Sequence, residues 1–118
     1  GGVMGAFTLQ AEIEEYGDLL DTALEECKRR GDACALAEAE YYSAKARAVR
    51  GMVADGQKAT LIPLLVKGDP TVNKALEKWR RLEVAYDNAK EARNVFKKKY
   101  DFTREQYQRE WTQAGMQR

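Results

Sequence analysis

Cysteine, histidine and carboxylate side chains carry out much of protein chemistry, and this chain of 118 residues offers few of them in a usable pattern. It contains no histidine, which excludes Ser–His triads, histidine general bases and ordinary histidine-bearing metal sites. Cys27 and Cys34 are seven residues apart. Helical residues at that spacing are separated by about 10 Å, too far for a disulfide within the chain. We expect two buried, reduced thiols on one helix face, with pairing between two copies left open under oxidation.

The carboxylates gather in two short groups, Glu12, Glu14 and Glu15 in one and Glu38 and Glu40 in the other. Paired carboxylates can serve acid–base chemistry or hold metals, and helical bundles build iron sites from Glu-x-x-His motifs. Without histidine, both groups are better interpreted as solvated helix surface. Gly51, Gly56 and Gly68 lack the spacing and the strand of a phosphate-binding loop. The sequence therefore predicts a protein that is not an enzyme and uses no cofactor or metal.

Six basic residues in the second half form the strongest candidate for a contact with nucleic acid or an acidic partner. They are Lys90, Arg93, Lys97, Lys98, Lys99 and Arg104. On a helix, most of them share one side with an aromatic stripe of Tyr86, Tyr100, Tyr107 and Trp111. Basic side chains beside aromatic rings suit single-stranded nucleic acid, which needs phosphate neutralisation and stacking surfaces. The three tyrosines also occupy heptad positions, however, which favours a core role for these rings. Lys45, Arg47 and Arg50 form a second, weaker basic cluster.

Residues that repeat every seven positions predict a long helix in the first half. The two seam positions are Ile13, Leu20, Cys27, Cys34, Tyr41 and Ala48, and, three residues later, Tyr16, Ala23, Arg30, Ala37, Ala44 and Gly51. This pattern predicts a helix over about residues 7–54. Arg30-Gly31-Asp32 resembles a helix stop followed by a restart. Because a turn has no reason to preserve the heptad phase, we predict one continuous helix, with a kink or turn at Gly31 as the alternative.

The second half repeats the pattern after an apolar connector over residues 55–69. Its seam positions are Val72, Trp79, Tyr86, Arg93, Tyr100 and Tyr107, and Ala75, Leu82, Ala89, Phe96, Thr103 and Glu110. Asp69-Pro70 is a helix start, so we predict a helix over about residues 70–114. The connector contains Leu61, Ile62, Leu64, Leu65 and Val66. This segment is too apolar for a free loop, and we expect it to cap the helix pair or to bind a protein partner.

Two helices of matched length predict an all-α, coiled-coil-like antiparallel hairpin. Residues 1–60 carry 7 basic and 11 acidic side chains, and residues 61–118 carry 13 and 8, so the charges of the two halves are complementary. We interpret residues 1–3 as a tag remnant and 4–118 as a single helical domain. No apolar run approaches the roughly 18 residues of a membrane span, and no signal-peptide pattern follows Met4. We therefore expect a cytoplasmic protein that does not bind membranes.

Apolar residues outside the two seams exceed what a two-helix hairpin needs. The candidates for an interface between copies are Leu36, Tyr42, Val49, Val84, Val95, Phe102 and Trp111. A second buried face would make a dimer with the architecture of a four-helix bundle. We expect the chain to associate with itself, as a dimer or higher oligomer, and with a protein partner, whereas nucleic acid is the less favoured ligand.

Three segments resemble small helical accessory proteins encoded by tailed bacteriophages and prophages. They are residues 41–52 (YYSAKARAVRGM), 59–62 (ATLI) and 67–73 (KGDPTVN). The similarity continues through Glu83-Val84-Ala85-Tyr86 to a charged C-terminal helix ending near Trp111, and covers about residues 38–112. The resemblance implies a product of early phage genes that acts in the host cytoplasm, near replication, recombination or counter-defence. It carries over no functional residue.

We therefore expect a non-enzymatic, phage-type protein-interaction module that inhibits or modulates a nucleic-acid-processing or defence protein of the host or the phage. One alternative is an accessory protein that binds single-stranded DNA or RNA. Another is a structural or assembly factor of the virion.

Overall fold

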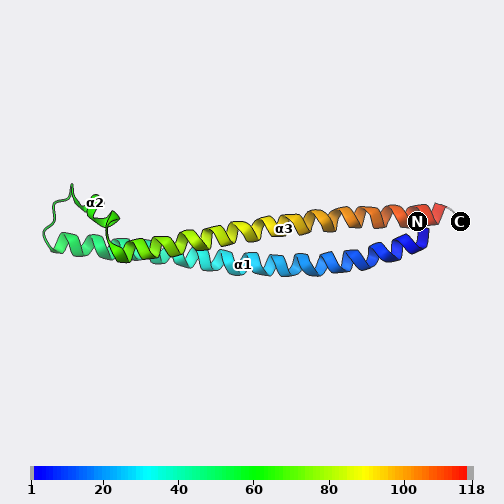
Figure 1. The fold of residues 1–118 in the computed structure, drawn as a ribbon, viewed down its shortest axis with the longest axis horizontal. Helices are drawn as coiled ribbons and strands as arrows, with labels where there is room; N and C mark the ends of the chain where they lie inside the picture. The colour runs from blue at the N-terminus through cyan, green and yellow to red at the C-terminus, as the bar shows by residue number, and fades with distance from the viewer. Residues whose placement is uncertain (1, 117–118) are drawn as a thin grey trace. The chain divides into compact units, whose positions relative to one another are not determined.

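The computed structural model describes residues 2–116 and contains three helices. They are α1 (Gly2–Ala54), α2 (Ile62–Lys67) and α3 (Pro70–Met116), and the described residues form no strand. The predicted all-α antiparallel hairpin is confirmed. The chain groups into two compact units: unit 1 contains residues up to 28 and from 88 onward, and unit 2 contains residues 29–87. In each unit a segment of α1 pairs with an antiparallel segment of α3, and α2 belongs to unit 2 (Figure 1).

Helix α1 runs through Gly31 without a turn, as the unbroken heptad phase predicts. It also begins earlier than predicted, since Gly2 and Val3 of the suspected tag remnant are helical, whereas Gly1 lies outside the described residues. Helix α3 begins at Pro70, as predicted, and extends two residues beyond the predicted end. Among the described residues, no helix is both long and apolar enough to cross a membrane.

The C-terminus of α1 is closed by a Schellman motif. Gly56 adopts a positive φ of 78°, which favours glycine because it has no Cβ. The Gly56 N–H donates to the Val53 carbonyl at 3.1 Å, and the Gln57 N–H donates to the Met52 carbonyl at 3.0 Å. These two bonds satisfy carbonyls that the helix leaves free at its end, so the chain turns here into the connector.

The N-terminus of α3 is fixed by a side-chain cap. Asp69 Oδ1 accepts a hydrogen bond from the Val72 N–H at 3.0 Å, and Pro70 occupies the first helical position, where no N–H is required. Replacing Asp69 with alanine should lower the free energy of unfolding by about 1 kcal/mol. Asparagine at this position should retain most of that stability because its side-chain oxygen accepts the same bond. Urea unfolding followed by circular dichroism measures both variants, and equal losses for the two would contradict the capping role.

The heptad register correctly predicts the buried seam. Among the predicted positions every α3 residue is buried or half-buried, and Gly51 is the one exposed position on α1. Helix α1 contributes small side chains, including Ala23, Ala37 and Ala44, whereas α3 contributes rings such as Trp79 and Tyr100. Cys27 and Cys34 are free and only 6% and 9% exposed, which confirms the predicted buried thiols.

Two glycines of α1 make room for tyrosine rings of α3. In unit 1, a Cβ on Gly17 would stand 3.5 Å from Cε2 of Tyr100. In unit 2, a Cβ on Gly31 would stand 3.2 Å from Cε1 and Cζ of Tyr86, which is closer than ordinary van der Waals contact. The lack of a side chain at Gly31 therefore admits the Tyr86 ring.

Candidate functional site

The connector folds back onto both long helices in unit 2. Val66 of α2 and Val72 of α3 are each 3% exposed and form a core cluster with Ala44 of α1. Ile62 packs against this cluster, together with side chains of α1 and α3. Two of the five predicted interaction residues, Ile62 and Val66, thus hold α2 in place.

The other three predicted residues form an exposed apolar surface. Leu61, Leu64 and Leu65 are 44%, 69% and 39% exposed. Residues four apart lie on the same face of a helix, so Ile62 and Val66 share one face, and Leu61 and Leu65 share another. We call Leu61, Leu64 and Leu65 the outer leucines. Three neighbouring leucines left in water are typical of a surface that another molecule covers.

An apolar groove of about 580 Å³ lies beside the outer leucines, between all three helices. Its lining is Tyr41, Lys45 and Val49 from α1, Ile62, Pro63, Val66 and Lys67 from α2, and Val72, Asn73 and Leu76 from α3. Asn73 Nδ2 donates a hydrogen bond to the Lys67 carbonyl at 3.0 Å, which ties the end of α2 to the first turn of α3. The groove lies within the range of about 300–1,000 Å³ typical of ligand pockets.

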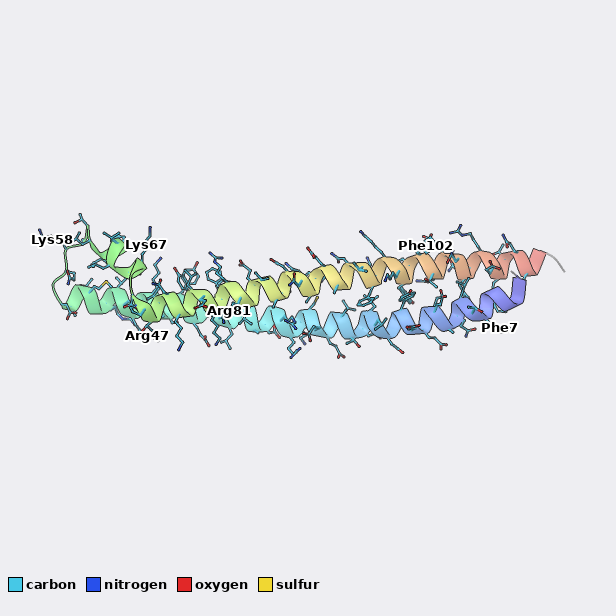
Figure 2. All side chains as sticks on the ribbon, viewed as in Figure 1. Phe7, Arg47, Lys58, Lys67, Arg81 and Phe102 are labelled. Carbon is cyan, nitrogen blue, oxygen red and sulfur yellow. The ribbon has the colours of Figure 1, made fainter. Side chains whose placement is uncertain are left out.

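Two basic side chains, Lys45 and Lys67, line this groove, and four more belong to the same part of the chain. We call residues 41–76 the connector end; its basic residues are Lys45, Arg47, Arg50, Lys58, Lys67 and Lys74, against Asp55 and Asp69. All six are exposed, and within the described residues none forms an ion pair. Figure 2 shows Arg47, Lys58 and Lys67 at this end of unit 2. The rest of unit 2 carries five basic and six acidic side chains, so its positive charge is concentrated at the connector end.

The basic strip predicted from the sequence lies in unit 1. Lys97, Lys98 and Arg104 are exposed and form no ion pair among the described residues, whereas Lys90 and Arg93 are half-buried. Lys99 Nζ lies 5.9 Å from the centroid of the Tyr16 ring. The paired segment of α1 carries seven carboxylates between residues 12 and 26, which reduces the positive potential along the strip.

The aromatic rings beside the strip are engaged within the helix pair. Tyr100 lies against the backbone at Gly17, and the Tyr107 and Trp111 rings meet edge to face at 6.1 Å. All three side chains are half-buried. Their position favours the predicted core role over stacking on nucleic-acid bases.

The predicted interface residues fall into two groups. Leu36, Tyr42, Val84, Val95 and Phe102 are 49–63% exposed. Val49 instead packs against the core cluster of unit 2, and Trp111 contacts Phe7 at 5.9 Å as well as Tyr107. Self-association through the exposed group stays a prediction.

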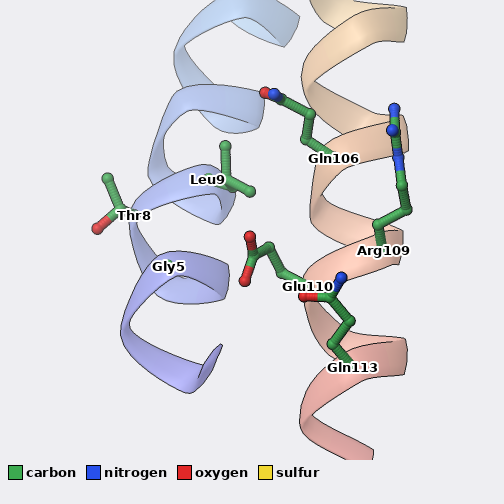
Figure 3. Close-up of a pocket in the computed structure, with 7 residues that line it drawn as sticks. All are labelled: Gly5, Thr8, Leu9, Gln106, Arg109, Glu110 and Gln113. Atoms are coloured by element: carbon green, nitrogen blue, oxygen red, sulfur yellow. The ribbon is translucent and has the colours of Figure 1, made fainter. Parts of the chain in front are cut away.

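A second hollow, of about 480 Å³, lies in unit 1 between α1 and α3. Figure 3 shows the Glu110 carboxylate directed from α3 toward Gly5 of α1. Its Oε2 atom is buried and has no hydrogen-bond partner among the described residues. Thr8, Gln106, Arg109 and Gln113 complete a mixed polar lining around one leucine, Leu9. The described residues contain no group of three or more His, Cys, Asp or Glu side chains placed to hold a metal ion.

Several groove residues were not anticipated as a site, in particular Lys67, Asn73 and Leu76. Val72 was predicted as a seam residue, and Lys45 as part of a weaker basic cluster. The signal available in the sequence was the nearness of this cluster to the apolar connector. The packing of α2 brings the two features together, and no periodic pattern in the sequence specifies that packing.

Comparison of the chain with protein-family models, with curated proteins and with solved structures finds no match. The choice of a functional surface therefore depends on the geometry described above.

Proposed function

We propose that this protein is a non-enzymatic helical interaction module that presents its connector end to another protein. The observation that carries the proposal is the exposure of the outer leucines beside an apolar groove. Burying a leucine side chain completely contributes about 1.5–3 kcal/mol relative to leaving it in water. Three partly exposed leucines and a groove are together enough for the anchor of an interface.

The helix pair of unit 2 supports this surface. Val66 and Ile62 attach α2 to α1 and α3, the Schellman motif ends α1, and the Asp69 cap starts α3. The outer leucines therefore stand on a preorganised support, which reduces the entropy lost when a partner binds.

The kind of partner is suggested by the resemblance to phage accessory proteins. The three segments that carry the resemblance, 41–52, 59–62 and 67–73, all fall within the connector end. We therefore propose that the partner is a nucleic-acid-processing or defence protein of the host or the phage, and that binding inhibits or modulates it.

Paired affinity captures test the proposal. The wild-type chain and the double variant Leu61→Asp/Leu64→Asp are each used to capture proteins from cells of the source. The variant should capture about tenfold less of the partner, or less still, because charges replace the apolar anchor. The control, Val95→Asp/Phe102→Asp, changes two comparably exposed side chains in unit 1 and should retain the partner. Equal loss in both variants, loss in the control alone, or release of the partner by nuclease would contradict the proposal.

A further inference from the structure

We infer that the groove at the connector end binds an apolar segment of a partner protein whose flanks carry acidic residues. This inference rests on the proposed function and specifies the chemistry of the partner. It follows from the groove lining, from the two lysines within that lining and from the net positive charge of the connector end.

The floor of the groove suits aliphatic or aromatic side chains. Val49, Ile62, Val66 and Val72 line it, and the last two are almost fully buried beneath it. The outer leucines do not line the groove, but each is next in the sequence to a residue that does: Ile62, Pro63 or Val66. A peptide segment can place one or two side chains in the groove and contact the outer leucines at the same time.

Lys45 and Lys67 provide positive charge on two of the elements that line the groove. Lys45 comes from α1 and Lys67 from the end of α2, and both side chains are exposed. Lys45 Nζ lies 5.9 Å from the Tyr41 ring centroid, and neither lysine forms an ion pair among the described residues. Both ammonium groups are therefore available to carboxylates on a segment lying in the groove.

The surrounding charge selects against basic segments. The connector end carries six basic and two acidic side chains, and Asp69 already accepts the Val72 N–H. A segment with lysines at its flanks would meet the like charges of Lys45 and Lys67 and the net positive charge of the connector end. A segment with aspartates or glutamates would be attracted and oriented, most strongly at low ionic strength.

A folded or extended peptide fits these features better than the other anionic ligands. A flat anionic membrane would contact the outer leucines and leave the concave groove unfilled. Proteins that bind single-stranded nucleic acid offer exposed rings for stacking, whereas the one aromatic ring in the lining, Tyr41, is packed against Trp79 at a centroid distance of 5.5 Å.

The test is a selection of random twelve-residue peptides displayed on phage against the full chain. We expect the enriched peptides to combine at least two large apolar residues with a net negative charge. A synthetic copy of an enriched peptide should lose about tenfold in affinity, or more, for the Lys45→Glu/Lys67→Glu variant. The matched control is Lys97→Glu/Lys98→Glu, which reverses two exposed lysines of unit 1 and should bind the peptide as the wild type does. Thermal unfolding of both variants should match the wild type because none of the four lysines forms an ion pair with another described residue.

Enrichment of basic or uncharged peptides, no enrichment, or equal loss of affinity in both variants would overturn the inference. The inference would also be overturned if the chain bound phosphatidylserine vesicles as tightly as it binds the peptide and lost that binding when Leu64 was replaced. If the captured partner is lost with the outer-leucine variant but binds the Lys45→Glu/Lys67→Glu variant normally, the inference fails while the proposed function stands. If neither variant affects the partner, the proposed function fails as well.

Discussion

Replacing Gly31 with leucine is expected to lower the free energy of unfolding by about 2 kcal/mol. The new Cβ would lie 3.2 Å from two ring atoms of Tyr86, and the remaining carbons of leucine would need space that the ring occupies. Overpacking of this kind costs about 3 kcal/mol at its upper range, and the better helix propensity of leucine returns somewhat less than 1 kcal/mol. Urea unfolding followed by circular dichroism measures the difference.

Gly51 provides the matched control for this substitution. It also lies in α1, but a Cβ there would meet nothing within 4 Å. Leucine at position 51 should therefore stabilise the chain by up to about 0.8 kcal/mol through helix propensity alone. In the Tyr86→Ala background, the Gly31→Leu substitution should cost less than it does in the wild type, because the ring that the leucine would meet is absent. Stabilisation by leucine at both positions would contradict the close packing of Gly31 against Tyr86.

Aspartate in place of Val66 is expected to detach α2 from the helix pair. Val66 is 3% exposed within the core cluster, and an unpaired buried carboxylate costs about 3 kcal/mol or more. Because α2 is a six-residue helix, releasing it relieves that cost without unfolding the rest of unit 2. Hydrogen exchange should show faster exchange across residues 62–67, and partner binding should be lost.

Aspartate at Leu64 distinguishes the loss of the binding surface from the loss of the packing that holds α2. Leu64 is 69% exposed and lies two residues before Val66 on α2. Leu64→Asp should change the free energy of unfolding by no more than about 0.5 kcal/mol and leave the exchange of α2 unchanged. It should still weaken partner binding. Similar exchange behaviour in the two variants would show that α2 is not held by Val66.

Much of the fold was predictable because it depends on local and periodic features. A seven-residue repeat specifies which residues of a long helix face its partner, so the seams, the buried cysteines and the continuity of α1 through Gly31 all follow from it. Asp69-Pro70 marks a helix start by the capping side chain of Asp69 and the fixed φ of Pro70. These signals need no knowledge of distant contacts.

The groove was not predictable in the same way. Helix α2 is shorter than one heptad, so its sequence does not indicate which leucines face inward. Val66 and Leu65 are adjacent and both apolar, yet one is 3% and the other 39% exposed. The contact with Ala44 that separates them joins residues more than twenty positions apart. The pairing of Gly31 with Tyr86 likewise depends on the register between the two long helices.

Whether a basic residue is available to a partner depends on the charges that the fold places near it. Lys97 and Lys98 looked more significant in the sequence because they belong to a dense run. In unit 1 that run is paired with a strongly acidic segment of α1. Lys45 belongs to a weaker cluster in the sequence and Lys67 lies 22 residues away, but the fold brings both to the groove, where no described acidic side chain forms an ion pair with them.

Site-specific photocrosslinking tests most directly whether the connector end contacts another protein. A photoreactive phenylalanine analogue is placed at Leu64 in one variant and at Phe102 in another, since both side chains are exposed, at 69% and 59%. Each variant is irradiated in cells of the protein's source. The connector-end interface predicts a crosslink to a second protein from position 64 and none to that protein from position 102. A crosslink to it from position 102 alone, or from neither position, would contradict that interface.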